Sequence, residues 1–260
     1  MTTHAIADSA TMLRRSLRHT VRYPVMMVAF LAVPIILLLL FLGVFGGSVK
    51  AAVAGAANGI SYIDYIVPGI ILITAGYGCS TTALAVNKDM TEGIIARFRT
   101  MNVARTAVLT GHVVGAVLRT LIAVVLVVAV AFALGFRPHA DALAWLATAG
   151  LVLLFTLALT WLAVASGLAA KSPEGTTSFS LLAQLLPFVS SAFVPTGSMV
   201  AGVRWFAANE PFTPIINTIR GLLLGGPIGH AGIIAVAWCV GLTLVGYVWS
   251  HLLFNRDPSQ

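Results

Sequence analysis

Long apolar runs without charged residues most strongly constrain how this 260-residue chain can fold. A helix that crosses a bilayer needs about 20 predominantly apolar residues, because the hydrocarbon core is about 30 Å thick. Six such runs occur, and we expect a transmembrane helix in each. They cover approximately Val25 to Phe45, Tyr65 to Val86, a third run ending at Phe136, Ala142 to Ala170, Gly175 to Val203, and Gly221 to Ser250.

Composition excludes an ordinary soluble domain and predicts an all-α integral membrane protein. Hydrophobic residues make up 59% of the chain and charged residues only 9%, whereas soluble domains average about 45–50% and about 25%. The third run contains Arg119, which we expect at the inner end of its span, where the side chain can reach the interface. Cys79 and Cys239 lie within apolar runs, so we expect two buried free thiols rather than a disulfide.

The basic residues predict the orientation, because Lys and Arg are enriched in the cytoplasmic loops of membrane proteins. With a cytoplasmic N-terminus, eleven of the fifteen basic residues lie inside, and an even number of spans returns the C-terminus to the cytoplasm. The inner residues are Arg14, Arg15, Arg18, Arg22, Lys88, Arg97, Arg99, Arg105, Arg119, Lys171 and Arg256; the outer ones are Lys50, Arg137, Arg204 and Arg220. The net charge of +7 therefore indicates contact with anionic membrane lipids, not with nucleic acid.

Two segments outside the apolar runs have patterns of their own. Residues 9–23 alternate apolar and basic positions at near-helical spacing until Pro24, which predicts an N-terminal amphipathic helix on the inner membrane surface. A solvated basic tail is the alternative. Residues 196–229 combine prolines, aromatics and charges, and irregular backbone at membrane depth needs protein or water around it. We expect a re-entrant, outer-side cap of short helices there, before the last span.

The densest charge lies between the second and third runs, in the string NKDMTEGIIARFRTMNVAR from Asn87 to Arg105. We expect a cytosolic hairpin over residues 87–106, with a short helix from about Met90 to Arg99. Its acidic start and basic end suit the helix dipole. One apolar face, formed by Ile94, Ile95 and Phe98, would fit a groove on a partner protein. A solvated loop resting on the membrane is the alternative.

The sequence contains no phosphate loop, no H-E-x-x-H zinc helix and no G-x-S-x-G nucleophile elbow. The expected spans carry mainly hydroxyl and amide groups instead, which would suit a weakly polar path for an amphipathic molecule. The candidate path residues are Thr74, Tyr77, Ser80, Thr81, Gln184, Ser190 and Ser191. Small polar residues also pack and hydrogen-bond between membrane helices, so both interpretations remain open.

Five strings carry a family resemblance. They are DYIVPGI from Asp64, NKDMTEGIIARFRTM from Asn87 with AVLTGH after it, LGFRP from Leu134, SSAFVPTGSM from Ser190, and FAANEPFTPIINTIRGLL from Phe206. Together they resemble the membrane subunit of type-2 ATP-binding-cassette (ABC) exporters, in particular the daunorubicin-resistance branch of actinobacteria, over about Met12 to Leu253. The chain departs from that pattern at residues 101–103, which replace a Leu-Pro bend, and at Val200, where a Pro is common.

The resemblance implies a single permease domain over residues 1–260, in a bacterial plasma membrane with both termini cytoplasmic. Such a subunit is not an enzyme by itself and binds no cofactor, because two copies of a separate ATPase subunit bind ATP and Mg. A second permease copy or a paralogue completes the assembly. The charged hairpin would contact the ATPase through Asp89, Glu92, Gly93, Arg97, Phe98 and Arg99.

The implied activity is export of a hydrophobic or amphipathic compound such as a drug, an antibiotic or a lipid. A permease for polysaccharide or lipo-oligosaccharide export is an alternative with a similar layout. An ion-coupled secondary transporter is a second alternative, but that class places paired charges or broken helices in its spans. A membrane-embedded enzyme is a third, and the expected spans show no convergent set of catalytic residues.

Overall fold

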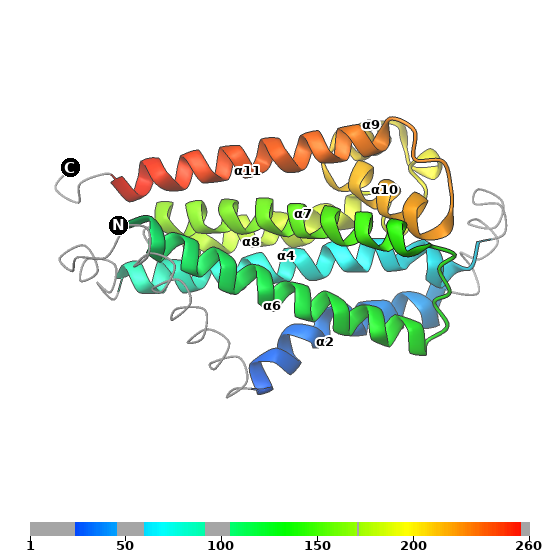
Figure 1. Cartoon of the computed structure of the whole chain (residues 1–260), viewed down its shortest axis with the longest axis horizontal. Helices are drawn as coiled ribbons and strands as arrows, with labels where there is room; N and C mark the ends of the chain where they lie inside the picture. The colour runs from blue at the N-terminus through cyan, green and yellow to red at the C-terminus, as the bar shows by residue number, and fades with distance from the viewer. Residues whose placement is uncertain (1–23, 46–59, 92–104, 171, 256–260) are drawn as a thin grey trace.

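The computed structural model describes residues 24–45, 60–91, 105–170 and 172–255, and every regular element in these ranges is helical. Long helices lie side by side along the molecule (Figure 1). Four of the described helices are long and apolar enough to cross a membrane: α4 (Tyr62–Thr91), α6 (Arg105–Ala133), α7 (Ala142–Ala169) and α11 (Ala231–Asn255). The shorter elements are α2 (Pro24–Leu40), η1 (Phe41–Phe45), α8 (Pro173–Leu185), η2 (Leu186–Val189), η3 (Thr196–Ser198), α9 (Ala201–Asn209) and α10 (Phe212–Leu224).

Helix α4 forms the centre of the bundle. It packs against α2, α6, α7, α8 and α10, and Ile66, Ile70 and Ile73 on it are fully buried. Helix α11 lies along α7 at the edge and exposes most of its apolar side chains, including Leu244 and Leu252. An exposed apolar face of this kind is stable only against hydrocarbon or another protein, which agrees with an integral membrane protein.

Small residues bring the central helix close to its neighbours. A Cβ atom at Gly76 would lie 2.8 Å from the Ala183 carbonyl oxygen in α8. A Cβ atom at Gly167 in α7 would lie 2.6 Å from the Ala83 carbonyl oxygen. Without side chains at these points the backbones approach closely, as is common between membrane helices. The two glycines therefore set the positions of α8 and α7 against α4.

The fifth apolar run, residues 175–203, is not the single continuous helix that we expected. Helix α8 ends at Leu185, and the chain continues through the 3₁₀ turn η2 into irregular backbone. Pro187 explains the break, because it has no N–H to donate and its ring clashes with the carbonyl four residues earlier. That carbonyl belongs to Ala183, which receives no hydrogen bond from Pro187 and faces Gly76 of α4.

Two other expectations also needed correction. Helix α4 continues to Thr91, so Asn87, Lys88 and Asp89 lie in its last turns and not in a loop. Helix α6 begins at Arg105, which places Arg119 about 21 Å along the axis from that end, at a rise of about 1.5 Å per residue. Arg119 therefore lies in the middle of a continuous helix and not at the inner end of a short span.

The segment before the last helix consists of short helices, as expected. Helices α9 and α10 follow η3, and α10 ends at Leu224, before Gly225, whose φ of 71° is accessible to glycine at little cost. Both α9 and α10 lie at the end of the bundle where α4 begins (Figure 1).

Cys79 and Cys239 are buried free thiols, which confirms the expectation for the two cysteines. The amphipathic helix expected in residues 9–23 lies outside the described residues.

Candidate functional site

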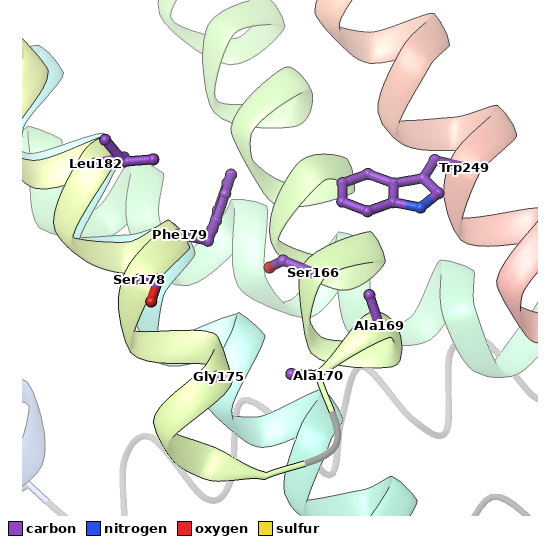
Figure 2. Close-up of a pocket in the computed structure, with 8 residues that line it drawn as sticks. All are labelled: Ser166, Ala169, Ala170, Gly175, Ser178, Phe179, Leu182 and Trp249. Carbon is purple, nitrogen blue, oxygen red and sulfur yellow. The ribbon is translucent and has the colours of Figure 1, made fainter.

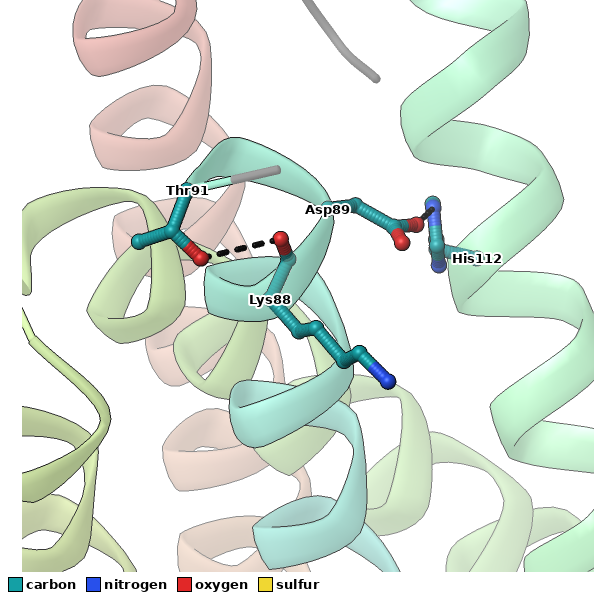
Figure 3. Close-up of polar contacts among 4 residues, drawn as sticks. All are labelled: Lys88, Asp89, Thr91 and His112. Atoms are coloured by element: carbon teal, nitrogen blue, oxygen red, sulfur yellow. Dashed lines mark hydrogen bonds and ion pairs between the residues drawn. The ribbon is translucent and has the colours of Figure 1, made fainter. Parts of the chain in front are cut away.

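The last turn of α4 contacts the first turns of α6 at the base of the charged segment (Figure 3). An Asp89 carboxylate oxygen lies 3.1 Å from Nε2 of His112, and both side chains are partly exposed. Thr91 donates a hydrogen bond to the Lys88 carbonyl. A polar contact thus joins the last turn of α4 to the second turn of α6. The other expected ATPase-contacting residues, Glu92, Gly93, Arg97, Phe98 and Arg99, lie outside the described residues.

Asn87 holds the same end of α4 to α7. Its amide donates hydrogen bonds to the Gly167 carbonyl at 3.2 Å and the Ala170 carbonyl at 2.7 Å. The last carbonyls of a helix lack partners within the helix, so a buried amide that reaches them stabilises the helix end. Asn87 is fully buried. The sequence did not indicate this role, because Asn87 begins a string of polar residues typical of a loop.

The seven candidate path residues do not form one row. Gln184 of α8 donates to Ser80 of α4 at 2.7 Å, which is a direct polar link between two helices. Thr74 and Thr81 donate to carbonyls of their own helix, and Tyr77 is partly buried on the same helix. Ser190 and Ser191 lie apart from these, in the turn after η2. The structure therefore divides the set into an α4–α8 group and a pair of serines.

Ser191 belongs to a polar network with α10. Its N–H donates to the Thr213 hydroxyl at 3.0 Å, and its own hydroxyl donates to the Asn217 side-chain oxygen at 2.9 Å. Ser190 donates to the Pro187 carbonyl at 2.6 Å. Both serines are buried. Their hydroxyls thus satisfy nearby backbone and side-chain groups.

Arg220 completes this network, and sequence reasoning placed it only among the outer basic residues. Its guanidinium donates to the Ser191 carbonyl at 2.8 Å, the Tyr65 carbonyl at 3.1 Å and the Asn217 side-chain oxygen at 2.8 Å. Its central carbon lies 3.7 Å from the centroid of the Tyr65 ring, a cation–π arrangement. The sequence feature that could have identified this role is a lone Arg in the apolar segment FTPIINTIRGLLL, three residues after an Asn.

Glu210 stabilises the start of α10. Its carboxylate accepts from the Phe212 N–H at 2.7 Å and the Thr213 N–H at 2.6 Å, which are orphan donors of the first turn. The residue is only 5% exposed. Burial raises the pKa of Glu210 to about 7, although the two N–H groups act in the opposite direction. This cap thus titrates near neutral pH.

An apolar groove of about 360 Å³ lies at the other end of the bundle, between the end of α7, the first half of α8, and α11 (Figure 2). It is lined by Ser166, Ala169, Ala170, Gly175, Ser178, Phe179, Leu182 and Trp249. Ser166 donates to the Ala163 carbonyl, so its hydroxyl is already engaged. The groove offers mainly carbon surface to whatever enters it.

Comparisons with known proteins give the family. The family model of the ABC-2 type transporter matches residues 9–224. The chain is 27% identical over 241 residues to the daunorubicin resistance ABC transporter permease protein of Streptomyces coeruleorubidus, covering 92% of this chain and 80% of the relative. It is 23% identical over 195 residues to a probable doxorubicin resistance ABC transporter permease protein of Mycobacterium tuberculosis, covering 75% of this chain and 71% of the relative. With most of its length matched by that model, the chain belongs to the ABC-2 type transporter family.

Proposed function

We propose that this chain is the membrane permease subunit of an ATP-driven exporter of hydrophobic or amphipathic compounds, such as a drug, an antibiotic or a lipid. The family match over residues 9–224 carries this proposal. The names of the two relatives, which refer to daunorubicin and doxorubicin resistance, support a drug-like cargo. The sparse charge of the described helices supports a cargo that is itself largely apolar.

The proposed topology is a single permease domain in the bacterial plasma membrane with six spans and both termini in the cytoplasm. The four long helices supply four spans, α2 with η1 the first, and α8 with η2 the fifth. The short length of α10 and its place beside the start of α4 support a re-entrant, outer-side cap over residues 196–229. The excess of basic residues in the expected cytoplasmic segments of the sequence supports the orientation.

The energy source in this proposal is a partner. The sequence holds no phosphate loop, so two copies of a separate ATPase subunit would bind ATP and Mg. A second permease copy or a paralogue would complete the transporter. The ATPase would push on the 87–106 hairpin, through Asp89, Glu92, Gly93, Arg97, Phe98 and Arg99. The Asp89–His112 contact and the Asn87 hydrogen bonds support this route, because they join the end of α4, where the hairpin begins, to α6 and α7.

The proposed path for the cargo runs along α4 and α8. Its polar residues are Thr74, Tyr77, Ser80, Thr81 and Gln184, with Ser190 and Ser191 at the outer end. The Ser80–Gln184 hydrogen bond supports a shared path, because it joins α4 to α8 where both present polar groups to each other. Most hydroxyls along this route donate to backbone carbonyls. The surface left for a cargo is therefore weakly polar, which suits an amphipathic compound.

Co-purification with a candidate ABC ATPase subunit tests the function directly. We expect wild-type chain to bind the ATPase and to export daunorubicin from ATP-loaded vesicles. Glu92→Ala, and the pair Arg97→Ala with Arg99→Ala, should lower ATPase association at least tenfold without changing thermal stability. Glu174→Ala, an exposed acidic residue at the start of α8, is the matched control and should bind normally. Robust ATP hydrolysis by the purified chain alone would refute the proposal.

A further inference from the structure

Ser191 has all three of its polar groups bonded to other segments. The N–H and the hydroxyl bond to Thr213 and Asn217 of α10. The carbonyl accepts from Arg220 of α10 at 2.8 Å and from the Tyr65 hydroxyl of α4 at 3.2 Å. Ser191 is 3% exposed. A residue outside any helix is thus attached to two helices at once.

The side of this contact formed by α10 and α4 is rigidly packed. Ile215, Ile216 and Ile219 of α10 are fully buried in the main apolar core. Arg220 also donates to the Tyr65 carbonyl from Nε and Nη2, and it lies over the Tyr65 ring. Arg220 is therefore held on the wall formed by α10 and α4, independently of Ser191.

The other side is a short irregular segment, residues 190–195, which we call the corner. It lies between η2 and η3 and is not helical. Its aromatic residue Phe193 stacks on Phe41 of η1, with ring centroids 3.9 Å apart. The corner therefore touches η1 on one side and the α10–α4 wall on the other. The corner has no ladder of helical hydrogen bonds, so the polar bonds of Ser191 and the apolar packing of the buried Ala192 and Phe193 hold it in place.

The charge of Arg220 is met by dipoles only. Within the described part of the chain, no carboxylate lies within ion-pair distance of its guanidinium. Asp64, next to Tyr65, accepts instead from the Arg137 N–H at 3.0 Å. Hydrogen bonds from an arginine to carbonyl and amide oxygens satisfy irregular backbone at membrane depth. They also exchange more readily for water than a buried ion pair would.

The network lies at the far end of the path from the charged hairpin. Tyr65 and Ser80 lie on the same helix, about 22 Å apart at a rise of about 1.5 Å per residue. The Ser80–Gln184 pair thus lies between the hairpin and the corner. Figure 1 shows α10 at the end of the bundle where α4 begins, opposite the end where α4 stops at Thr91. In the proposed orientation, this is the outer end.

We propose that Arg220 is a positioning residue of the export step: with Asn217 it holds the Ser191 corner against α10 and α4, closing the outer end of the path. The cargo leaves when the corner separates from Asn217 and Arg220, and the path closes again when these hydrogen bonds re-form. This inference rests on the proposed export function. It also assigns Ser191 to the closure itself, and not to the lining of an open path.

Reversible cross-linking of the corner tests this inference. The full chain, with Cys79→Ala and Cys239→Ala, carries Ser191→Cys and Asn217→Cys and is reconstituted with its ATPase. A short bifunctional thiol reagent that reductant cleaves then joins the two cysteines. We expect ATP-driven daunorubicin transport to fall at least tenfold on linking and to recover on reduction. Each single-cysteine variant should transport at the same rate before and after treatment with the reagent, whatever its own starting rate.

Transport by the linked protein within twofold of the unlinked protein would show that the corner need not move, and would overturn the inference while leaving the export function intact. Failure of the wild-type chain to associate with the ATPase would overturn both. A second variant covers misfolding of the double-cysteine protein. In Arg220→Gln, labelling of Ser191→Cys by an impermeant maleimide should rise at least fivefold, and Arg220→Lys should fall between the two. Equal labelling in all three would also overturn the inference.

Discussion

At the scale of single residues, Arg119 places a charged side chain where a bilayer makes a charge energetically costly. It lies in the middle of α6 and, within the described part of the chain, forms no hydrogen bond or ion pair. A basic side chain near the centre of a spanning helix costs roughly 2.5–3.5 kcal/mol on insertion scales. A charge retained at that cost is a sign of function more often than of stability.

Replacing Arg119 by Leu therefore has an expected direction. Arg119→Leu should raise the thermal midpoint of unfolding in detergent, because it removes an unpaired charge from an apolar environment. Arg119→Lys is the control that keeps the charge, and it should leave the midpoint nearly unchanged. A lower midpoint in the Leu variant would contradict the expectation and show that Arg119 makes a stabilising contact.

Glu210 gives a pH dependence at the same scale. Its pKa rises from an ordinary value near 4.5 to about 7 in the folded protein, because the carboxyl is buried. Between these two values the folded state holds more protons than the unfolded state, so the free energy of unfolding falls as the pH rises through that window. The wild type should thus lose more stability between pH 4.5 and 7 than Glu210→Gln does.

Thermal unfolding of both proteins at several pH values measures this difference, with Glu174→Gln as a control at an exposed carboxyl. The slope of the Glu174→Gln protein should match that of the wild type between pH 5 and 7. Parallel profiles for the wild type and Glu210→Gln would mean that Glu210 does not titrate in this window.

At the scale of elements, the packing of α11 on α7 depends on one glycine. A Cβ atom at Gly246 would lie 2.7 Å from the Leu162 nitrogen and 2.9 Å from the Trp161 Cβ atom. Gly241 in the same helix has nothing within 4 Å of its Cβ position. The two positions share a helix and differ in what faces them.

Gly246→Ala should therefore destabilise the protein, by about 1–3 kcal/mol as for other overpacked sites. Gly241→Ala is the matched control and should be neutral, or stabilising by up to about 1 kcal/mol, because alanine favours the helix. Thermal unfolding in the same detergent compares the two. Equal midpoints would show that α11 moves away from α7 at no cost.

At the scale of the whole molecule, the proposed orientation places both ends of the chain on one side of the membrane. In a Cys79→Ala and Cys239→Ala background, Ser259→Cys should be protected in intact cells from an impermeant maleimide, whereas Ser48→Cys, in the first expected outer loop, should react. Permeabilised cells are the control in which Ser259→Cys must also react. Labelling of Ser259→Cys in intact cells would reverse the proposed orientation.

The class of fold could be predicted from the sequence, because hydrophobicity and length act locally. A run such as Ala142 to Ala170 can satisfy its backbone in lipid only as a helix, and α7 occupies Ala142–Ala169. The short helices of 196–229 also followed from local signals, since prolines end helices wherever they stand. The family resemblance could also be read from the sequence, because it depends on short strings of residues and not on how they pack.

The polar network could not be predicted, because its members come from distant parts of the chain. In the sequence, 126 residues separate Tyr65 from Ser191, and 29 separate Ser191 from Arg220. Only packing brings the three residues within hydrogen-bond distance. For the same reason the local sequence predicts a loop at Asn87, whereas its hydrogen-bond acceptors lie at the distant end of α7. The sequence alone determined that the chain is a bundle of membrane helices. Tertiary structure decided which of its few polar groups meet, because hydrogen bonds depend on distance and direction, which residue order does not specify.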